Sequence, residues 1–377
     1  MSAKNLYLYL LAASFIVAAC AQEAPSATEV VPTRVASSTP VPTRTVRPSE
    51  TPTEVPVCEG RRIAYVQEST EGTAIWVVCE DGTGRQQLVA DFGYQYYYGY
   101  MRWVPNSNRI LFWRRATEGI TVESVELDGT RRSEDLFIPT SSMFESGFTL
   151  LPDGLVLRED WEDEDRGISL ANLDGTEVRQ LVEDGFGASL SPDGTRFAFR
   201  RDNPSDFLLN DLYTMSMDGT GEMKLVEGLQ VYPTFWSPDG QMLAFGAVDP
   251  NDEDAYNMGR DLYVVASDGT QLRRLTRGMI INPYDLAWSP DSRLIAFSTE
   301  DFVTYEVDVS GDFDPWFLGL GRNPVWSPDG RKVAFQGWNS ELNSWTLYLI
   351  DRRDYGYEQV LLAEHPNSNV WESVWEP

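Results

Sequence analysis

The most regular feature of the chain is a short phrase in which a polar turn is followed by alternating apolar residues. In its fullest form it covers residues 326–335, where Trp-Ser-Pro-Asp-Gly precedes Arg-Lys-Val-Ala-Phe. Proline, aspartate and glycine at these positions favour a type I turn with a left-handed exit. The alternation of Val333 and Phe335 with smaller or polar residues then predicts a strand with one buried face.

This phrase recurs along most of the chain. Copies or weaker copies begin at Trp103, Leu151, Leu190, Trp236 and Trp288, and the C-terminal Trp375-Glu-Pro opens another. A second turn signal, Asp-Gly between two apolar runs, stands at residues 81–82, 128–129, 174–175, 218–219 and 268–269. It predicts a hairpin in each unit, and turn chemistry accounts for its aspartates. Repeats of roughly 40–50 residues made of strands and turns are typical of a β-propeller.

The repeated phrase resembles the TolB-type, WD-repeat-like propeller repeat, and the resemblance covers nearly all of residues 58–377. It implies an all-β fold, and the spacing of the phrases predicts seven blades, with six as the alternative. TolB itself has six blades behind an α/β domain, so its partner is not carried over. Propellers of this kind serve as binding platforms and, less often, as enzyme scaffolds.

The two ends of the repeat region complete each other. Residues 61–66 form a strand phrase with no turn before it, whereas residues 373–375 open a turn with nothing after it. We therefore expect the C-terminal strand to join strands near residues 62–66, 74–79 and 86–90 in one blade. Such pairing closes a propeller and removes open sheet edges.

The N-terminal residues have the pattern of an export signal. Lys4 precedes an apolar run of 14 residues, Leu6 to Ala19, which is short for a membrane span. Val-Ala-Ala-Cys at residues 17–20 resembles the bacterial lipobox, which implies cleavage before Cys20 and attachment of lipid to it. An ordinary signal peptide with an incidental cysteine is the alternative. We predict a lipoprotein signal peptide over 1–19, a Pro/Thr-rich disordered tether over 20–57, and the propeller over 58–377.

The charge of the chain limits its partners. The formal net charge is −28, and the four basic and four acidic residues of segment 1–57 cancel, so the predicted propeller carries all of it. An acidic surface of this size repels nucleic acid, which we exclude as a partner. We expect a monomer in the bacterial cell envelope, held outside the cytoplasmic membrane through the lipid on Cys20.

The two remaining cysteines are expected to form a disulfide. With Cys20 used for lipid, Cys58 and Cys79 form an even pair in an oxidising compartment. Pairing of Ile63 with about Val77 in the first hairpin brings Cys79 near the segment that follows Cys58.

Signals of catalysis are largely missing. The sequence has one histidine, His365, and lacks a Gly-x-Ser-x-Gly elbow, so we assign no catalytic residue and no metal site. No cofactor is predicted. Calcium is the alternative, through residues 249, 251 and 253 or residues 308, 310, 312 and 314. A pair of carboxylates acting on a carbohydrate also stays open.

The candidate binding residues lie in long connections on one face of the propeller. In propeller geometry the Ser-Pro-Asp-Gly and Asp-Gly turns share one face, and the longer connections share the other. The predicted site residues are Tyr94, Tyr96, Tyr97, Tyr98, Trp161, Asp160, Asp163, Asp252 and Asp254. Tyrosine supplies contact area with a polar tip, and the carboxylates favour basic or neutral partners. Alternatively, the tyrosines pack between blades and the acidic loops are solvated surface.

These observations favour a lipid-anchored binding or scaffold protein that engages an envelope protein or a glycan through this face. The alternative is a carbohydrate-active hydrolase or lyase that uses carboxylates on the same face.

Overall fold

The computed structural model describes residues 58–70, 72–90, 101–104, 107–116, 119–139, 148–150, 155–160, 167–172, 177–252, 260–352, 359–363 and 369–376. These residues all lie in the second of two compact units, Ser49–Pro377. Their regular elements are strands, and they include no helix that is long and apolar enough to cross a membrane. The predicted all-β fold class is confirmed. The predicted signal peptide and tether lie outside the described residues.

Within the described residues, the strands fall into seven groups of four. The first group has the order β28 (Asn369–Trp375), β1 (Arg62–Ser69), β2 (Gly72–Cys79) and β3 (Gln86–Val89). The second group contains β4 (Met101–Trp103), β5 (Arg109–Ala116), β6 (Gly119–Glu126) and β7 (Arg131–Pro139). The third contains β8 (Phe148–Leu150), β9 (Leu155–Asp160), β10 (Gly167–Asn172) and β11 (Arg179–Glu183).

The remaining strands form four groups in chain order. The fourth group contains β12 (Gly185–Leu190), β13 (Arg196–Asn203), β14 (Asp206–Ser216) and β15 (Met223–Val226). The fifth contains β16 (Gln230–Trp236), β17 (Met242–Val248), β18 (Asp261–Ala266) and β19 (Arg273–Arg274). The sixth contains β20 (Ile281–Trp288), β21 (Leu294–Thr299), β22 (Val303–Asp308) and β23 (Trp316–Leu320). The seventh contains β24 (Arg322–Trp326), β25 (Lys332–Asn339), β26 (Ser344–Asp351) and β27 (Gln359–Ala363).

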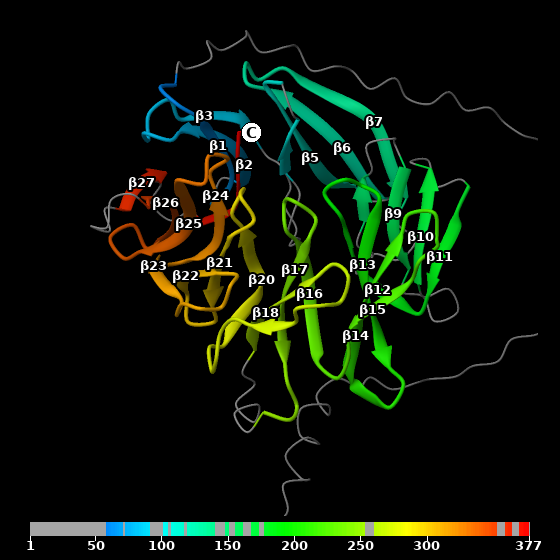
Figure 1. Cartoon of the computed structure of the whole chain (residues 1–377). Coiled ribbons are helices and arrows are strands. Elements are labelled where there is room, and N and C mark those ends of the chain that lie inside the picture. The colour runs from blue at the N-terminus through cyan, green and yellow to red at the C-terminus, as the bar shows by residue number, and fades with distance from the viewer. Residues whose placement is uncertain are drawn as a thin grey trace, which may run out of the picture. The chain divides into compact units, whose positions relative to one another are not determined.

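The groups follow one another in chain order around a common centre (Figure 1). A single parallel bridge, between Asn210 and Gln230, joins the fourth and fifth groups into one eight-stranded sheet. Closure of the ring, and with it the choice between seven blades and six, stays a prediction.

The Ser-Pro-Asp-Gly turns are held by their own side chains. Ser327 Oγ accepts a hydrogen bond from the backbone N of Lys332 at 2.9 Å and donates to Asp329 at 2.7 Å. Gly330 takes the left-handed exit with φ of 69°. The same serine contacts recur at Ser191, Ser237 and Ser289. These turns fold locally, which is why the phrase is readable in the sequence.

The strands after these turns are buried on both faces, where the alternation predicts one. Val333, Ala334 and Phe335 are all fully buried. Val333 and Phe335 pack in a cluster with residues of the sixth group, whereas Ala334 packs with residues of the first group, among them Tyr65. The prediction of one buried face was wrong because neighbouring groups cover each sheet from both sides.

Five tryptophans join neighbouring groups through the same hydrogen bond. Each indole Nε1 donates to the carbonyl oxygen of the residue that precedes the neighbour's own phrase. The pairs are Trp103 with Val374 (3.2 Å), Trp375 with Val325 (3.3 Å), Trp326 with Ala287 (3.0 Å), Trp288 with Phe235 (2.9 Å) and Trp236 with Ser189 (2.9 Å). The tryptophan of the phrase is therefore an inter-group contact as well as a core residue.

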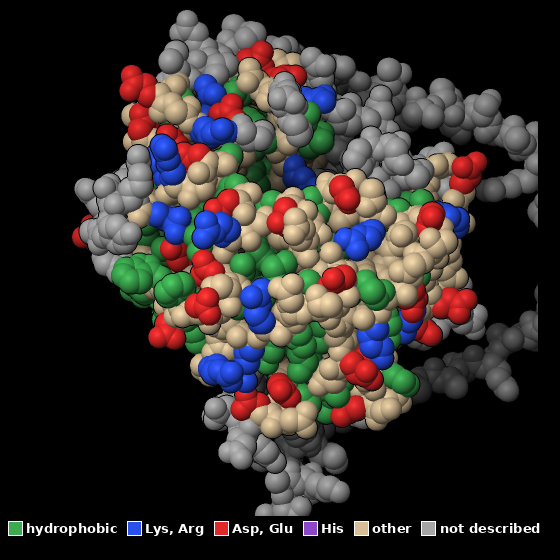
Figure 2. All heavy atoms as spheres, viewed as in Figure 1, with side chains coloured by type: hydrophobic (Ala, Val, Ile, Leu, Met, Phe, Trp, Pro, Cys, Tyr) green, Lys and Arg blue, Asp and Glu red, His purple; other side chains and the backbone are tan. Residues whose placement is uncertain are grey.

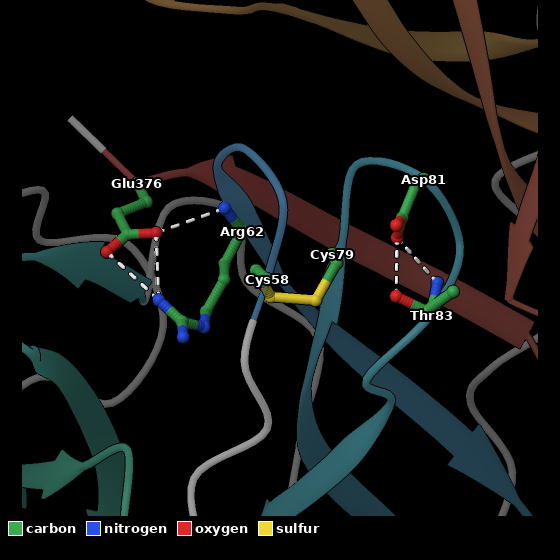
Figure 3. Close-up of a disulfide and its surroundings, with 6 residues drawn as sticks. All are labelled: Cys58, Arg62, Cys79, Asp81, Thr83 and Glu376. Carbon is green, nitrogen blue, oxygen red and sulfur yellow. Dashed lines mark hydrogen bonds and ion pairs between the residues drawn. A yellow bond between two sulfur atoms is a disulfide. The ribbon is translucent and has the colours of Figure 1, made fainter.

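The first group unites the two ends of the described chain. β28 pairs antiparallel with β1, with Ile63 opposite Trp375, which is the strand pairing that the sequence predicts. Glu376 accepts from the backbone N of Arg62 at 3.0 Å and forms an ion pair with its guanidinium at 3.4 Å (Figure 3).

A disulfide lies beside this junction. It joins Cys58 to Cys79, whose Cα atoms are 5.5 Å apart (Figure 3). The hairpin register differs by one residue from the expected one, since Ile63 faces Val78 and Arg62 faces Cys79. The disulfide therefore attaches Cys58, at the start of the described chain, to the end of β2, which lies beside β1, the strand that pairs with β28.

Candidate functional site

Hydrogen bonds between connections define two faces of the strand groups. The Ser-Pro-Asp-Gly turns bond the hairpin turns of their own groups, as in Ser267 N to Gln241 O at 2.8 Å and Val309 N to Arg293 O at 3.0 Å. We call this side the turn face. The opposite strand ends, with the β13–β14, β17–β18, β21–β22 and β25–β26 connections, form the loop face. This division agrees with the prediction from propeller geometry.

Most of the predicted binding residues lie outside the described residues: Tyr94, Tyr96, Tyr97, Tyr98, Trp161, Asp163 and Asp254. Cys20 lies outside them as well. Asp160 is the last residue of β9, opposite Gly167 at the loop-face end of β10. The role of the predicted tyrosine, tryptophan and aspartate residues in binding stays a prediction.

Asp252 is described, and it has a partner within the chain. Arg274 forms ion pairs with both Asp252 and Asp261, and Asp261 is buried. Asp261 also accepts from Thr276 Oγ1 at 2.7 Å. Asp252 therefore fastens the start of the β17–β18 connection to the outer strand β19.

In each of the two sets of residues considered for calcium, the first aspartate caps a turn, while residue 253 lies outside the described residues. Asp249 Oδ1 accepts from the backbone N of Asn251 at 2.9 Å, and Asp308 Oδ1 accepts from that of Ser310 at 2.8 Å. Among the described residues, no cluster of three or more His, Cys, Asp or Glu side chains is placed to hold a metal ion. The hairpin aspartates behave alike: hydrogen bonds from the hydroxyl and backbone N of Thr220 lower the pKa of Asp218.

An aromatic cluster stands on the loop face of the sixth and seventh groups. The ring centroid of Trp345 lies 5.0 Å from that of Phe302 and 5.8 Å from that of Trp338, both edge-on. Phe302 is 44% exposed and Trp338 is 49% exposed. The guanidinium of Arg322 stacks on Trp345 at 4.3 Å from the ring centroid. We call these four side chains the aromatic platform.

Local structure positions each member of the platform. Phe302 lies in the tight β21–β22 turn with a φ of 60°, where its backbone N bonds Thr299 O. Trp338 and Trp345 face each other across the β25–β26 pair. Sequence reasoning missed this platform, and its available signal was two tryptophans that flank the connection 340–343.

A buried polar network runs from the platform toward the inner strands. Arg322 Nε and Asn323 Nδ2 donate to Gln336 Oε1 at 3.3 and 3.0 Å. The backbone N of Asn323 donates to Asp285 at 3.2 Å, and Ser298 Oγ donates to the same carboxylate. Gln336 is fully buried, and its Nε2 has no hydrogen-bond partner among the described residues. The network fixes Arg322 beneath the aromatic rings.

Asp285 and Glu159 are buried carboxylates on the inner part of the molecule. Burial raises the pKa of Asp285, against the hydrogen bonds from Ser298 and Asn323. Burial likewise raises the pKa of Glu159, although the backbone N atoms of Gly187 and Ala188 donate to it at 2.9 and 2.6 Å. A carboxyl group with a raised pKa keeps its proton to a higher pH than an exposed carboxyl group does.

The half-buried Arg200 lies near Glu159. Burial lowers the pKa of Arg200, and the negative charge of Glu159 opposes this shift. Its guanidinium stacks on Phe186 at 4.8 Å and donates to Val231 O at 3.0 Å. A Cβ on Gly187, where φ is 67°, would lie 2.3 Å from a guanidinium nitrogen, so a larger residue would be strained and would displace Arg200.

Comparisons with known proteins reveal the fold. No protein-family model matches the chain, and no curated protein matches it. The crystal structure of TolB from Acinetobacter baumannii has a TM-score of 0.50 and 18% identity over 70% of this chain and 66% of TolB. A puromycin hydrolase S511A mutant complexed with PGG has a TM-score of 0.59 and 17% identity over 81% of this chain and 52% of that one.

A third solved structure, oligogalacturonate lyase in complex with manganese, has a TM-score of 0.53 and 14% identity over 82% of this chain and 87% of that one. The chain thus spans less than two thirds of TolB and about half of the puromycin hydrolase. At these identities the likeness concerns architecture. The described part of the chain has a TolB-like β-propeller fold.

Proposed function

We propose that the chain is a lipid-anchored, extracytoplasmic binding protein of the bacterial envelope that engages an envelope protein or a glycan through its loop face. The observation that carries the proposal is the aromatic platform, which exposes Phe302 and Trp338 to solvent. The signal-like N-terminus with Cys20 and the TolB-like fold support the location. The predicted tyrosines and aspartates of residues 94–98, 160–163 and 252–254 would extend the same site.

The platform offers the contacts that recognition needs. Exposed faces of Phe302 and Trp338 supply apolar area for a sugar ring or a protein side chain. Arg322 donates a hydrogen bond to Gln336 on one side and stacks on Trp345 on the other. Its side chain is therefore already held in place in the unbound protein. A preformed site loses less entropy on binding than a mobile one.

The proposal is tested by crosslinking the full-length protein in native envelopes and identifying the attached partner. Replacing Phe302 and Trp338 together by alanine should remove the partner. The matched control is Leu272→Ala, which removes an apolar side chain of similar exposure, 46%, from the turn face. Unchanged melting temperatures establish that both variants fold. A partner that persists in the double variant and disappears in the control contradicts the proposal.

The second candidate is a carbohydrate-active hydrolase or lyase. The observation in its favour is the presence of two buried carboxylates, Asp285 and Glu159, in separate parts of the described structure, each with a pKa that burial raises. One of the similar structures is an oligogalacturonate lyase, so acidic oligosaccharides are the first substrates to try. Turnover that is abolished in both Asp285→Asn and Glu159→Gln would favour this candidate. Binding of the same sugars without product would favour the binding protein.

A further inference from the structure

The disulfide lies beside the pairing of the two ends of the described chain, in the first group (Figure 3). Cys58 precedes β1, and Cys79 is the last residue of β2. The backbone N of Glu80 donates to Arg61 O at 2.9 Å, which is the bond that marks the turn face in the other groups. The chain therefore enters the first group on the turn face, whereas the aromatic platform stands on the loop face.

β1 is the first strand that a pull on the preceding chain would reach. It pairs with β28 on one side and with β2 on the other. Arg61 Nη1 donates to Glu376 O at 3.0 Å, and the backbone N of Glu376 donates to Arg62 O at 2.9 Å. We call the β28–β1 pairing, with these contacts to Glu376, the end junction. Displacement of β1 would leave β28 without its paired strand and expose a sheet edge.

The disulfide changes where such a pull takes effect. Cys58 and Cys79 are 21 residues apart, and their bond closes a covalent loop that contains both β1 and β2. The shortest covalent path from Cys58 to the rest of the chain runs through the bond to Cys79. β1 therefore lies outside the path that carries the load, and it cannot be drawn away from the end of β2 while the bond is intact.

The end of β2 has its own attachments, apart from the end junction. Cys79 is fully buried, and its backbone N donates to Thr83 O at 2.9 Å across the turn to β3. The next residue, Glu80, forms an ion pair with Lys332 of the seventh group at 3.1 Å. Figure 2 shows basic and acidic side chains side by side over the region of β1–β3 and β24–β26 in Figure 1. The turn that receives the load is thus attached both to β3 and to the neighbouring group.

We propose that the Cys58–Cys79 disulfide is a mechanical clamp, which protects the end junction from tension that arrives through the chain preceding Cys58. The inference rests on the proposed function, because an anchored protein that holds a partner on its loop face is pulled between the anchor and that partner. Without the bond, the load passes through β1 and opens the end junction first. With the bond, the load enters at the end of β2 and leaves the end junction closed.

The proposal is tested by pulling single molecules of the full-length protein at constant force. Click-reactive amino acids that carry the handles replace Glu50, before Cys58, and Glu341, which is exposed in the β25–β26 connection. At the same force, the double variant Cys58→Ser, Cys79→Ser should unfold about tenfold faster than the oxidised wild type. Its unfolded length should be greater by about 70 Å, because the loop of 21 residues is released.

A second pulling direction separates a clamp from general stabilisation. Handles at Asp312, in the exposed β22–β23 turn, and at Glu341 load the sixth and seventh groups without passing through Cys58. In that direction the wild type and the double variant should unfold at nearly the same rate. Equal acceleration of the variant in both directions, or no acceleration in the first direction, would overturn the clamp.

Reduction of single wild-type molecules gives the same comparison if the double variant does not fold. Each molecule is first shown to be folded by its length and is then exposed to reductant at zero force. It should afterwards unfold faster in the first direction only. These measurements involve neither lipid nor partner, so a directional effect would support the clamp even if partner capture failed and refuted the proposed function. Partner capture without a directional effect would refute the clamp alone.

Discussion

The indole Nε1 of Trp326 donates a hydrogen bond to the carbonyl oxygen of Ala287, 3.0 Å away, and joins the seventh group to the sixth through the residue that precedes Trp288. The same relationship holds at four further junctions. Leu151 and Leu190 occupy the corresponding places in the third and fourth groups and carry no indole donor. Leu190 therefore cannot form this bond, and Leu151 lies outside the described residues.

The first prediction concerns this bond. Trp326→Phe removes the indole N–H donor and leaves the carbonyl oxygen of Ala287 without this hydrogen bond in a buried junction. We expect a loss of about 1–3 kcal/mol in the free energy of unfolding, from the lost bond and the smaller ring. Urea unfolding measures it. Trp316→Phe, at an exposed position, is the control and should change stability little. Equal stability of the two variants would contradict an inter-group role for the indole.

The second prediction concerns the C-terminal strand. A chain that ends at Trp371 loses Glu372–Trp375 of β28, the contacts of that strand with β1, and the Arg62–Glu376 ion pair. It exposes an edge of β1 and should lose cooperative unfolding and aggregate. A chain that ends at Glu376 keeps all these contacts and serves as the control. A sharp urea transition at the wild-type midpoint in the shorter chain would refute the prediction.

The third prediction concerns the disulfide. Cys58 and Cys79 are 21 residues apart, and a closed loop of this length stabilises by about 3 kcal/mol in the chain-entropy model. The double variant Cys58→Ser, Cys79→Ser should therefore unfold at lower urea concentration, and reduction of the wild type should match it. Added reductant should leave the variant unchanged. Two free thiols in protein purified from its native compartment would show that the bond does not form there.

Local chemistry decided how much the sequence could predict. The turn at Ser327–Gly330 and the pairing of β28 with β1 follow from residues adjacent in the chain or from the position of the termini. The aromatic platform does not, because Phe302 comes from one group while Trp338 and Trp345 come from another. The prediction followed the conspicuous tyrosines of residues 94–98, which lie outside the described residues.

The buried network was also beyond sequence reasoning. Asp285 is one of 58 acidic residues, and its burial results from the backbone of Asn323 in the next group closing over it. Likewise, Glu159 is distinguished by the two backbone donors of Gly187 and Ala188. These partners come from other strands, so no local spacing marks the carboxylates. The register of the first hairpin and the burial of the strands on both faces likewise depend on contacts that the local sequence does not mark.

The last prediction uses the raised pKa values of Asp285 and Glu159. The ordinary values are 3.8 and 4.5, and burial raises the pKa of both groups in the folded protein. The folded state therefore holds these protons more tightly than the unfolded chain. Where the folded state binds more protons, the free energy of unfolding falls as the pH rises. Each group thus reduces stability as the pH increases from its ordinary pKa through its folded pKa.

Replacing the carboxylates by amides removes this decline. In Asp285→Asn and Glu159→Gln, we expect the unfolding free energy relative to wild type to rise with pH above about pH 4 and then level off. Asp268→Asn is the matched control: hydrogen bonds from Thr270 lower the pKa of Asp268 below its ordinary value of 3.8, so the effect of that variant changes only below about pH 4 and should stay nearly constant relative to wild type above it. Urea unfolding at pH 4, 5, 6 and 7 separates the two behaviours. Parallel pH profiles for all three variants would mean that the burial of Asp285 and Glu159 does not control their protonation.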